Sequence, residues 1–238
     1  MGTAMDRSFY LDLAAGGLRM PIGTDLVLHE HADHDAILFD PERLGKVVEA
    51  AARRYNTPLA VALMDLTVEK AALLGMLGIP REQALTYHFE SCPDELTVDL
   101  VKTRLDDALD QRSAANAGAV HYIATQTDLI PVGMCIGPFS LMTKLLADPI
   151  TPVYLAGSGI AAEEDEEVRA VERLLEMSLW IVQRSIDAQI RAGARAMFVA
   201  EPAACSAYIS PTQVAGGADV WERYVMVPNR AVRRQLAD

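Results

Sequence analysis

The stretch that decides the fold is PLAVALMD, residues 58–65, in which seven apolar residues are followed by Asp65. A short, continuous apolar run of this kind is typical of a strand that is buried on both faces, as strands of parallel sheets are. A helix is predicted from about Thr67, and it should end at Gly78 and Pro80, where a left-handed residue and a missing N–H stop helices. These residues therefore predict one βα unit with an acid at the carboxyl end of its strand.

Two similar runs follow, PVGMCIGP at 131–138 and ARAMFVAEP at 194–202, and a doubtful fourth, ALTYHF, lies at 84–89. Apolar residues at helical spacing predict helices between and after these runs, over residues 40–55, 94–117, 163–192, 218–226 and 229–238. Strands that alternate with helices indicate an α/β fold with a parallel sheet.

The length sets a limit on that sheet. A closed eight-stranded barrel takes about 250 residues, whereas nearly sixty of the 238 residues here precede the first strand. We therefore expect a partial (βα)8 TIM-barrel-like fold, with an irregular or helical segment at 1–39 and the N-terminal part of the barrel at 40–238. The exposed edge of such a sheet should promote self-association or pairing with another chain.

Charge and cysteine content narrow the class of protein. The 33 acidic and 21 basic residues give a net charge of −12, which disfavours nucleic acids and membrane surfaces as partners. The three cysteines form no CxxC pattern, and this is typical of a reducing compartment. No apolar run reaches membrane-spanning length, so we expect a cytoplasmic protein that acts on a small molecule or contacts another protein.

The segment LHEHADHD, residues 28–35, contains three of the five histidines, His29, His31 and His34. One interpretation is a metal site, because an HxH pair directly after an apolar strand resembles the first motif of barrel metallohydrolases. The other is a solvated polar loop. Only His88 and His121 remain as further histidine ligands, and neither follows a clear strand. We therefore expect a loop without bound metal, with these histidines as weak candidate ligands.

Asp65 is the main catalytic candidate, because barrel enzymes place their chemistry at the carboxyl ends of the strands. A partly desolvated carboxylate there could hold a cationic or N–H-bearing ligand, or exchange a proton. It could equally cap the helix that begins near Thr67. Both interpretations stay open.

Two strand-to-helix junctions add candidates for ligand binding. GPFS at 137–140 combines a glycine that permits close approach with a helix start that attracts anions. EPAACS at 201–206 follows the third strand in the same way, and its Cys205 is interpreted as a small packing residue because no histidine base lies beside it in the sequence. We expect Ser140, Glu201 and Ser206 to face the same cavity as Asp65.

Taken in order, MDLTVEKAALLG, GMCIGPFSLMTKLL and FVAEPAACSAYISP resemble the uroporphyrinogen decarboxylase superfamily, which includes corrinoid-linked methyltransferases. The resemblance runs from about Arg19 to the end of the chain. It implies a βα barrel in which Asp65 matches the acid that holds pyrrole N–H groups in the decarboxylase branch. It also implies substrate-binding roles for residues of the two pocket-lining loops, namely Gly137, Phe139, Ser140, Glu201 and Ser206.

Two differences between this sequence and the motifs of the superfamily indicate which branch it resembles. The decarboxylases carry an arginine-rich RQAGR near their first strand, whereas this chain reads RMPIGTDLVLHE with Arg19 as its only arginine. The resemblance therefore favours corrinoid-dependent methyl transfer to a thiol or similar acceptor, with a corrinoid protein as a partner.

The methyltransferases bind zinc through a His-x-Cys motif and a later cysteine in the second half of the barrel, and this sequence contains no such half. We thus expect no cofactor held by this chain itself, and weak or no activity on its own. Tetrapyrrole decarboxylation, a non-catalytic half-barrel and an HxH metallohydrolase stay open as alternatives.

Overall fold

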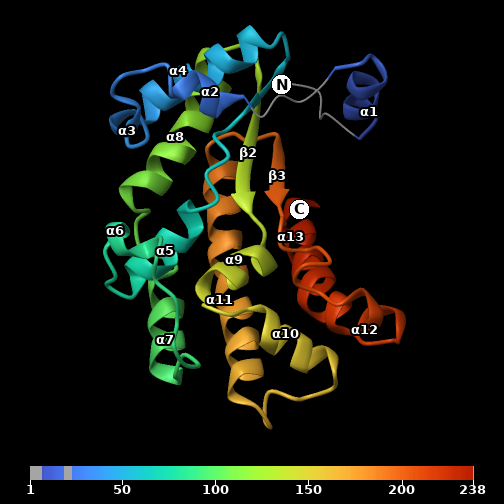
Figure 1. The fold of residues 1–238 in the computed structure, drawn as a ribbon. Helices are drawn as coiled ribbons and strands as arrows, with labels where there is room; N and C mark the ends of the chain where they lie inside the picture. Colours follow the sequence, from blue (N-terminus) through green and yellow to red (C-terminus); the bar gives the residue numbers. More distant parts are fainter. Residues whose placement is uncertain (1–6, 19–22, 238) are drawn as a thin grey trace. The chain divides into compact units, whose positions relative to one another are not determined.

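The computed structural model describes residues 7–18 and 23–237, so Arg19 lies outside the described residues (Figure 1). The chain divides into two compact units, each assembled from three separate segments. The first unit consists of Met1–Asp65, Asp110–Met134 and Ile186–Phe198. The second consists of Leu66–Leu109, Cys135–Ser185 and Val199–Asp238.

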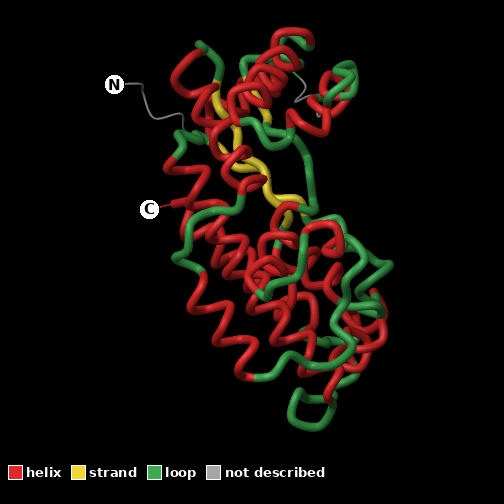
Figure 2. Tube along the Cα trace, turned by 90° about the vertical axis from the view of Figure 1, so that its left-hand side faces the viewer, coloured by secondary structure: helices red, strands yellow, loops and turns green. Residues whose placement is uncertain are grey.

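Three strands form one small parallel sheet in the order β1-β2-β3: β1 (Leu59–Val61), β2 (Ile130–Ile136) and β3 (Ala196–Ala200). The strands predicted from the three apolar runs, and their parallel direction, are confirmed. Figure 2 shows how little of the chain is strand compared with helix. The fold is mixed α/β with 60% helix. The sheet is compatible with part of a barrel, but a barrel itself is not shown.

Most of the described chain is helical. The helices, in chain order, are α1 (Arg7–Ala15), α2 (Thr24–Leu28), α3 (His34–Ile37), α4 (Pro41–Arg54), α5 (Val68–Met76), α6 (Arg81–Ala84), α7 (Glu95–Arg104), α8 (Gln111–Gln126), α9 (Pro138–Leu145), α10 (Ile150–Gly157), α11 (Glu166–Arg191), α12 (Pro211–Ala215), the π-helical turn η1 (Glu222–Met226) and α13 (Val227–Ala237). None of these described helices combines the length and the apolar character needed to cross a membrane.

In the first unit, β1 is buried on both faces. Ala60 belongs to a cluster with apolar side chains of α4 and α8. Leu59 and Val61 point the other way, where Ile130 and Val132 of β2 join them under side chains of α1. Because successive strand residues alternate between the faces of a sheet, an uninterrupted apolar run requires cover on both. Here α4 and α8 provide that cover on one face, and α1 on the other.

Helix α4 begins where the sequence predicts. Asp40 is its N-cap, and the carboxylate oxygen Oδ1 accepts hydrogen bonds from the N–H groups of Glu42 and Arg43, both at 3.0 Å. Pro41 occupies the first helical turn, where its missing N–H costs no hydrogen bond. The helix buries Leu44 and the other apolar residues that the periodicity places on one stripe.

Three element predictions are wrong in detail. The single helix expected over 94–117 is two helices, α7 and α8, because Asp110 accepts hydrogen bonds from the N–H groups of Arg112 and Ser113 and starts a new one. The doubtful strand at 84–89 is reduced to one parallel bridge between Phe89 and Leu146. The two C-terminal helices expected at 218–226 and 229–238 are one helical run through η1 and α13.

The π-helical turn in that run has an identifiable cause. Pro228 has no N–H to donate, and its ring would collide with the carbonyl of Tyr224 in a regular α-helix. Widening the turn over η1 avoids the collision while the chain stays helical. The side chain of Asn229 then donates to the carbonyl of Val225 at 2.9 Å, which satisfies a carbonyl in the disturbed turn.

The cap of α4 can be tested directly. Replacing Asp40 by Ala should lower the free energy of unfolding by about 1 kcal/mol, because two N–H groups lose their acceptor. Asp40→Ser, which keeps a capping oxygen, should recover most of that loss. Urea unfolding followed by circular dichroism measures both. Equal stability of Asp40→Ala and the wild type would show that the cap contributes nothing.

Candidate functional site

The carboxylate of Glu201, the residue after β3, lies at the beginning of α9 in the second unit. Its Oε1 accepts a hydrogen bond from the N–H of Phe139 at 3.1 Å, and its Oε2 accepts one from the N–H of Ser140 at 2.8 Å. These are N–H groups of the first helical turn, which have no partner within the helix. A negative charge is favourable at this end of a helix dipole. The anion expected at this helix start is therefore the chain's own side chain.

Gly137 is the residue that allows Glu201 to come so close. A Cβ atom built on Gly137 would lie 2.1 Å from Cδ of Glu201, far inside van der Waals contact. The backbone of Gly137 is extended, with φ at −80°, so space and not backbone conformation requires glycine here. Its N–H also donates to the carbonyl of Ala200 at 2.6 Å. The glycine predicted to permit close approach does so, to a side chain of the same chain.

Two further hydrogen bonds fix this cluster. Asn229 of α13 donates through Nδ2 to Oε1 of Glu201 at 3.0 Å. Oγ of Ser140 accepts from the N–H of Ala203 at 3.0 Å, and both residues are buried. The structure thus brings together Gly137, Phe139, Ser140 and Glu201, four of the predicted site residues, and adds Asn229. We name these five residues the Glu201 cluster.

The other residues of the EPAACS loop lie in a different environment. Ser206 and Cys205 are exposed, in a turn after β3. The interpretation of Cys205 as a packing residue is therefore wrong, because its side chain faces solvent. Hydrogen bonds from the N–H groups of Ala204 and Tyr208 form short turns that carry this segment away from the strand direction.

Asp65 lies in the first unit, four residues after the end of β1. Its Oδ2 accepts a hydrogen bond from Nη2 of Arg112 in α8 at 3.1 Å. The arginine side chain is 0% exposed and that of Asp65 is 16% exposed, so the carboxylate has the outer position of the pair. The N-cap position of α5 is taken by Thr67 and not by Asp65. The structure thus supplies a cationic partner for Asp65 that sequence reasoning missed.

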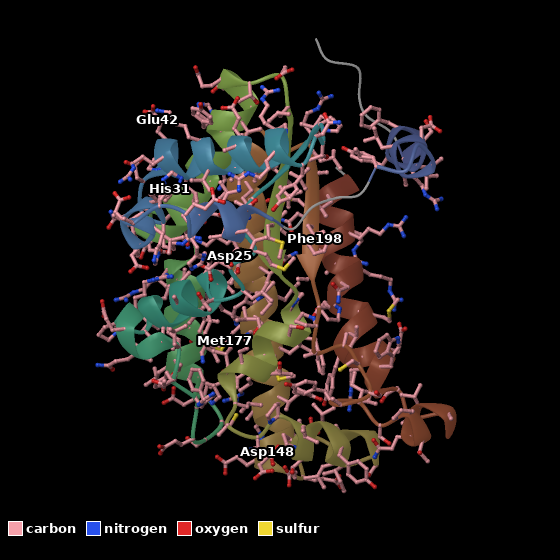
Figure 3. All side chains as sticks on the ribbon, turned by 45° about the horizontal axis from the view of Figure 1, so that its top comes forward. Asp25, His31, Glu42, Asp148, Met177 and Phe198 are labelled. Atoms are coloured by element: carbon pink, nitrogen blue, oxygen red, sulfur yellow. The ribbon has the colours of Figure 1, made fainter. Side chains whose placement is uncertain are left out.

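Two short helices flank the LHEHADHD segment, whose residues 29–33 form a turn. Thr24–Leu28 is helix α2, so the strand required by the metallohydrolase interpretation does not exist, and His34 begins α3. Nδ1 of His29 lies 2.9 Å from the carbonyl oxygen of Asp25, and the ring centroids of His29 and His34 lie 4.9 Å apart with the ring planes tilted by 41°. Figure 3 labels Asp25 and His31 in this part of the first unit.

The acids of the same segment form ion pairs with arginines of α4. Glu30 pairs with Arg54 at 2.6 Å, and Asp33 pairs with Arg43 at 2.6 Å. Each guanidinium lowers the pKa of its acidic partner, by hydrogen bonding above all. The prediction of a loop holds for residues 29–33, which form a turn between α2 and α3. Surface ion pairs attach this turn to α4.

Buried acid and thiol groups surround the end of β2 in the second unit. Glu69 is buried and accepts a hydrogen bond from Oγ of Ser185 at 2.8 Å. Burial raises the pKa of the Cys135 thiol well above its usual value, and the charges of Glu69 and Glu201 raise it further. The thiolate is the nucleophilic and metal-binding form of cysteine, so Cys135 is held in its inert form.

The zinc that the family resemblance implies finds no fit in these residues. Across residues 7–18 and 23–237, no group of three or more histidine, cysteine or acidic side chains is arranged to hold a metal ion. No family model matches the chain, and no curated protein matches it either. The function must therefore be argued from the local chemistry of each unit.

The Glu201 cluster gives a stability prediction. Glu201→Ala should lower the free energy of unfolding by about 2–3 kcal/mol, because the N–H groups of Phe139 and Ser140 lose a charged acceptor. Glu201→Gln, which keeps one acceptor oxygen, should lose clearly less. Urea unfolding measures both, and the exposed Glu95→Ala serves as the control. If Glu201→Ala loses no more stability than Glu95→Ala, the hydrogen bonds of the Glu201 cluster do not contribute to the stability of the protein.

The three thiols should react at very different rates with a water-soluble disulfide reagent. Exposed Cys205 should react first, and Cys92 more slowly because burial raises its pKa. Cys135 should react only after unfolding in denaturant. Mass spectrometry of labelled peptides identifies the order, with Cys205→Ser as the control that removes the fast phase. Rapid labelling of Cys135 in the native protein would contradict the assigned burial.

Proposed function

We propose that this chain belongs to a corrinoid-linked methyl-transfer enzyme with a uroporphyrinogen-decarboxylase-like barrel, and that Asp65 binds N–H groups of the tetrapyrrole-derived ligand. Three features support the proposal. The strands are parallel, an acid follows the first of them, and the sequence motifs occur in the order that the superfamily has them. Parallel sheets of α/β proteins bind ligands at the carboxyl ends of their strands.

The observation that carries the proposal is the Asp65–Arg112 pair. The 3.1 Å hydrogen bond from Nη2 of Arg112 fixes the orientation of the carboxylate. The guanidinium is on the buried side, so it offsets the charge of Asp65 from the interior while the carboxylate stays 16% exposed. A carboxylate that is oriented in this way and partly exposed is suited to face the N–H groups of a ligand. The amide side chains of a corrinoid and the ring nitrogens of a porphyrinogen both provide N–H donors.

Within this proposal the role of the chain is to bind and orient the ring. Methyl transfer would break the cobalt–carbon bond of a methylcorrinoid and form a carbon–sulfur bond to the acceptor thiolate, and the electron pair of the broken bond would stay on cobalt. In the family, zinc activates the acceptor thiol, and the described residues do not fit that metal. We therefore assign no step through zinc to these residues. The Glu201 cluster supports the start of α9 and takes no part in the reaction.

The test is a binding comparison. Wild-type protein is titrated with methylcobalamin and, separately, with a porphyrinogen, and binding is followed by absorbance and calorimetry. Asp65→Asn should bind the true ligand roughly 10–100-fold more weakly, because one charge-assisted hydrogen bond is lost. Tighter binding of methylcobalamin supports methyl transfer, and tighter binding of the porphyrinogen supports the second candidate, tetrapyrrole decarboxylation.

The matched control is Asp110→Asn, which removes a helix-capping carboxylate from the same unit. It should keep the wild-type affinity. Circular dichroism verifies that both variants are folded, since loss of Asp65 leaves the charge of Arg112 less well compensated. Equal ligand affinity in Asp65→Asn and the wild type would remove Asp65 from the binding site, and the proposal with it.

A further inference from the structure

Lys70 is unusual among the four lysines of this acidic chain, because it is only 4% exposed. It lies in the first turn of α5, and its Nζ donates to the carbonyl oxygen of Leu85 at 3.3 Å. An ammonium group has three donors, yet this carbonyl is its one hydrogen-bond partner among the described residues. By contrast, Lys46 pairs with Glu42, and Lys102 lies over the ring of Trp180.

Two more basic side chains lie near Lys70 in the second unit. The N–H of Phe89 donates to the carbonyl of Leu145 at 2.8 Å, and this bond holds the segment around residue 88 against the end of α9. His88 and Lys144, the residues immediately before this bonded pair, are thereby brought to the same region. We name Lys70, Lys144 and His88 the basic cluster.

Lys70 is held beside the same segment by its bond to the carbonyl of Leu85, three residues before His88. Burial lowers the pKa of Lys70 to about 8, and repulsion by the charge of Lys144 contributes to that shift. Burial likewise lowers the pKa of His88, and the charge of Lys70 lowers it further. In the part of the chain that the structure describes, no carboxylate forms an ion pair with any member of the basic cluster. The cluster thus has no ion-paired counter-charge, although the protein has a net charge of −12.

A buried ammonium without a counter-charge is unfavourable, and an anion placed beside it would offset that cost. We propose that Lys70, Lys144 and His88 form a binding site for an oxyanion group, a phosphate or a carboxylate, of a small molecule. Lysine binds such groups as a point charge. Of the three groups only His88 lines the neighbouring pocket of about 590 Å³, whose lining of residues 86–94 and Thr97 also includes Glu90 and Asp94. This site goes beyond the proposed methyl transfer and does not depend on it.

The experiment uses the full chain and two probes, inorganic phosphate and succinate, each titrated against chloride at constant ionic strength. Calorimetry measures affinity, and thermal unfolding measures the stabilisation that a bound anion gives to the native state. We expect saturable binding of at least one probe. The probe that binds more tightly distinguishes a phosphate-bearing from a carboxylate-bearing ligand.

The decisive variant is Lys70→Met, which keeps the length of the side chain and removes its charge. It should weaken binding at least tenfold and should be no less stable than the wild type without anion. Lys46→Met, an exposed lysine of the first unit, should bind as the wild type does. If Lys70→Met fails to fold, Lys144→Gln replaces it, with a smaller loss of affinity expected.

Two outcomes would overturn the site: no saturable binding of either anion, or undiminished affinity after both cluster substitutions. The Asp65→Asn variant should bind phosphate or succinate with wild-type affinity, because Asp65 belongs to the other unit. The oxyanion site and the corrinoid proposal therefore succeed or fail separately.

Discussion

The second unit depends on one carboxylate placed where three chain segments meet. Glu201 comes from the end of β3, it accepts hydrogen bonds from the first turn of α9, and it receives a third from α13 through Asn229. Glu201 can reach the start of α9 because Gly137 has no side chain, and a Cβ atom there would collide with the carboxylate. A helix start that would otherwise need a ligand or water is satisfied internally, so it acts as a rigid support.

The strands and the cap of α4 were predictable because their causes are local. An apolar run of strand length predicts a buried strand, and an Asp-Pro pair before apolar residues at helical spacing predicts a helix start, each from a few neighbouring residues. The division between α7 and α8 was missed because apolar spacing alone does not reveal that the carboxylate of Asp110 caps a new helix. The doubtful strand near Phe89 was not predictable from local residues, because its single bridge is made with Leu146, far away in the sequence.

The candidate site was predictable only in part. Asp65 and Glu201 were found because each directly follows a continuous apolar run in the sequence. Arg112 and Lys70 were missed, because each lies in the first turn of a helix, and nothing in its neighbours indicates that a long charged side chain is buried there. Burial of such a group is decided by elements that pack over it, and these come from other parts of the sequence. The same holds for Asn229, whose direction depends on the π-helical turn before it.

The distance in sequence between α9 and its cap has a consequence for synthesis of the chain. Glu201 follows the Ser140 N–H that it caps by 61 positions, so α9 leaves the ribosome well before its acceptor has been made. At about 5–20 residues per second, the delay is roughly 3–12 s. Throughout that interval the first turn of α9 has only water for its N–H groups. The nascent second unit should therefore reach its native packing late, once β3 and then α13 have emerged.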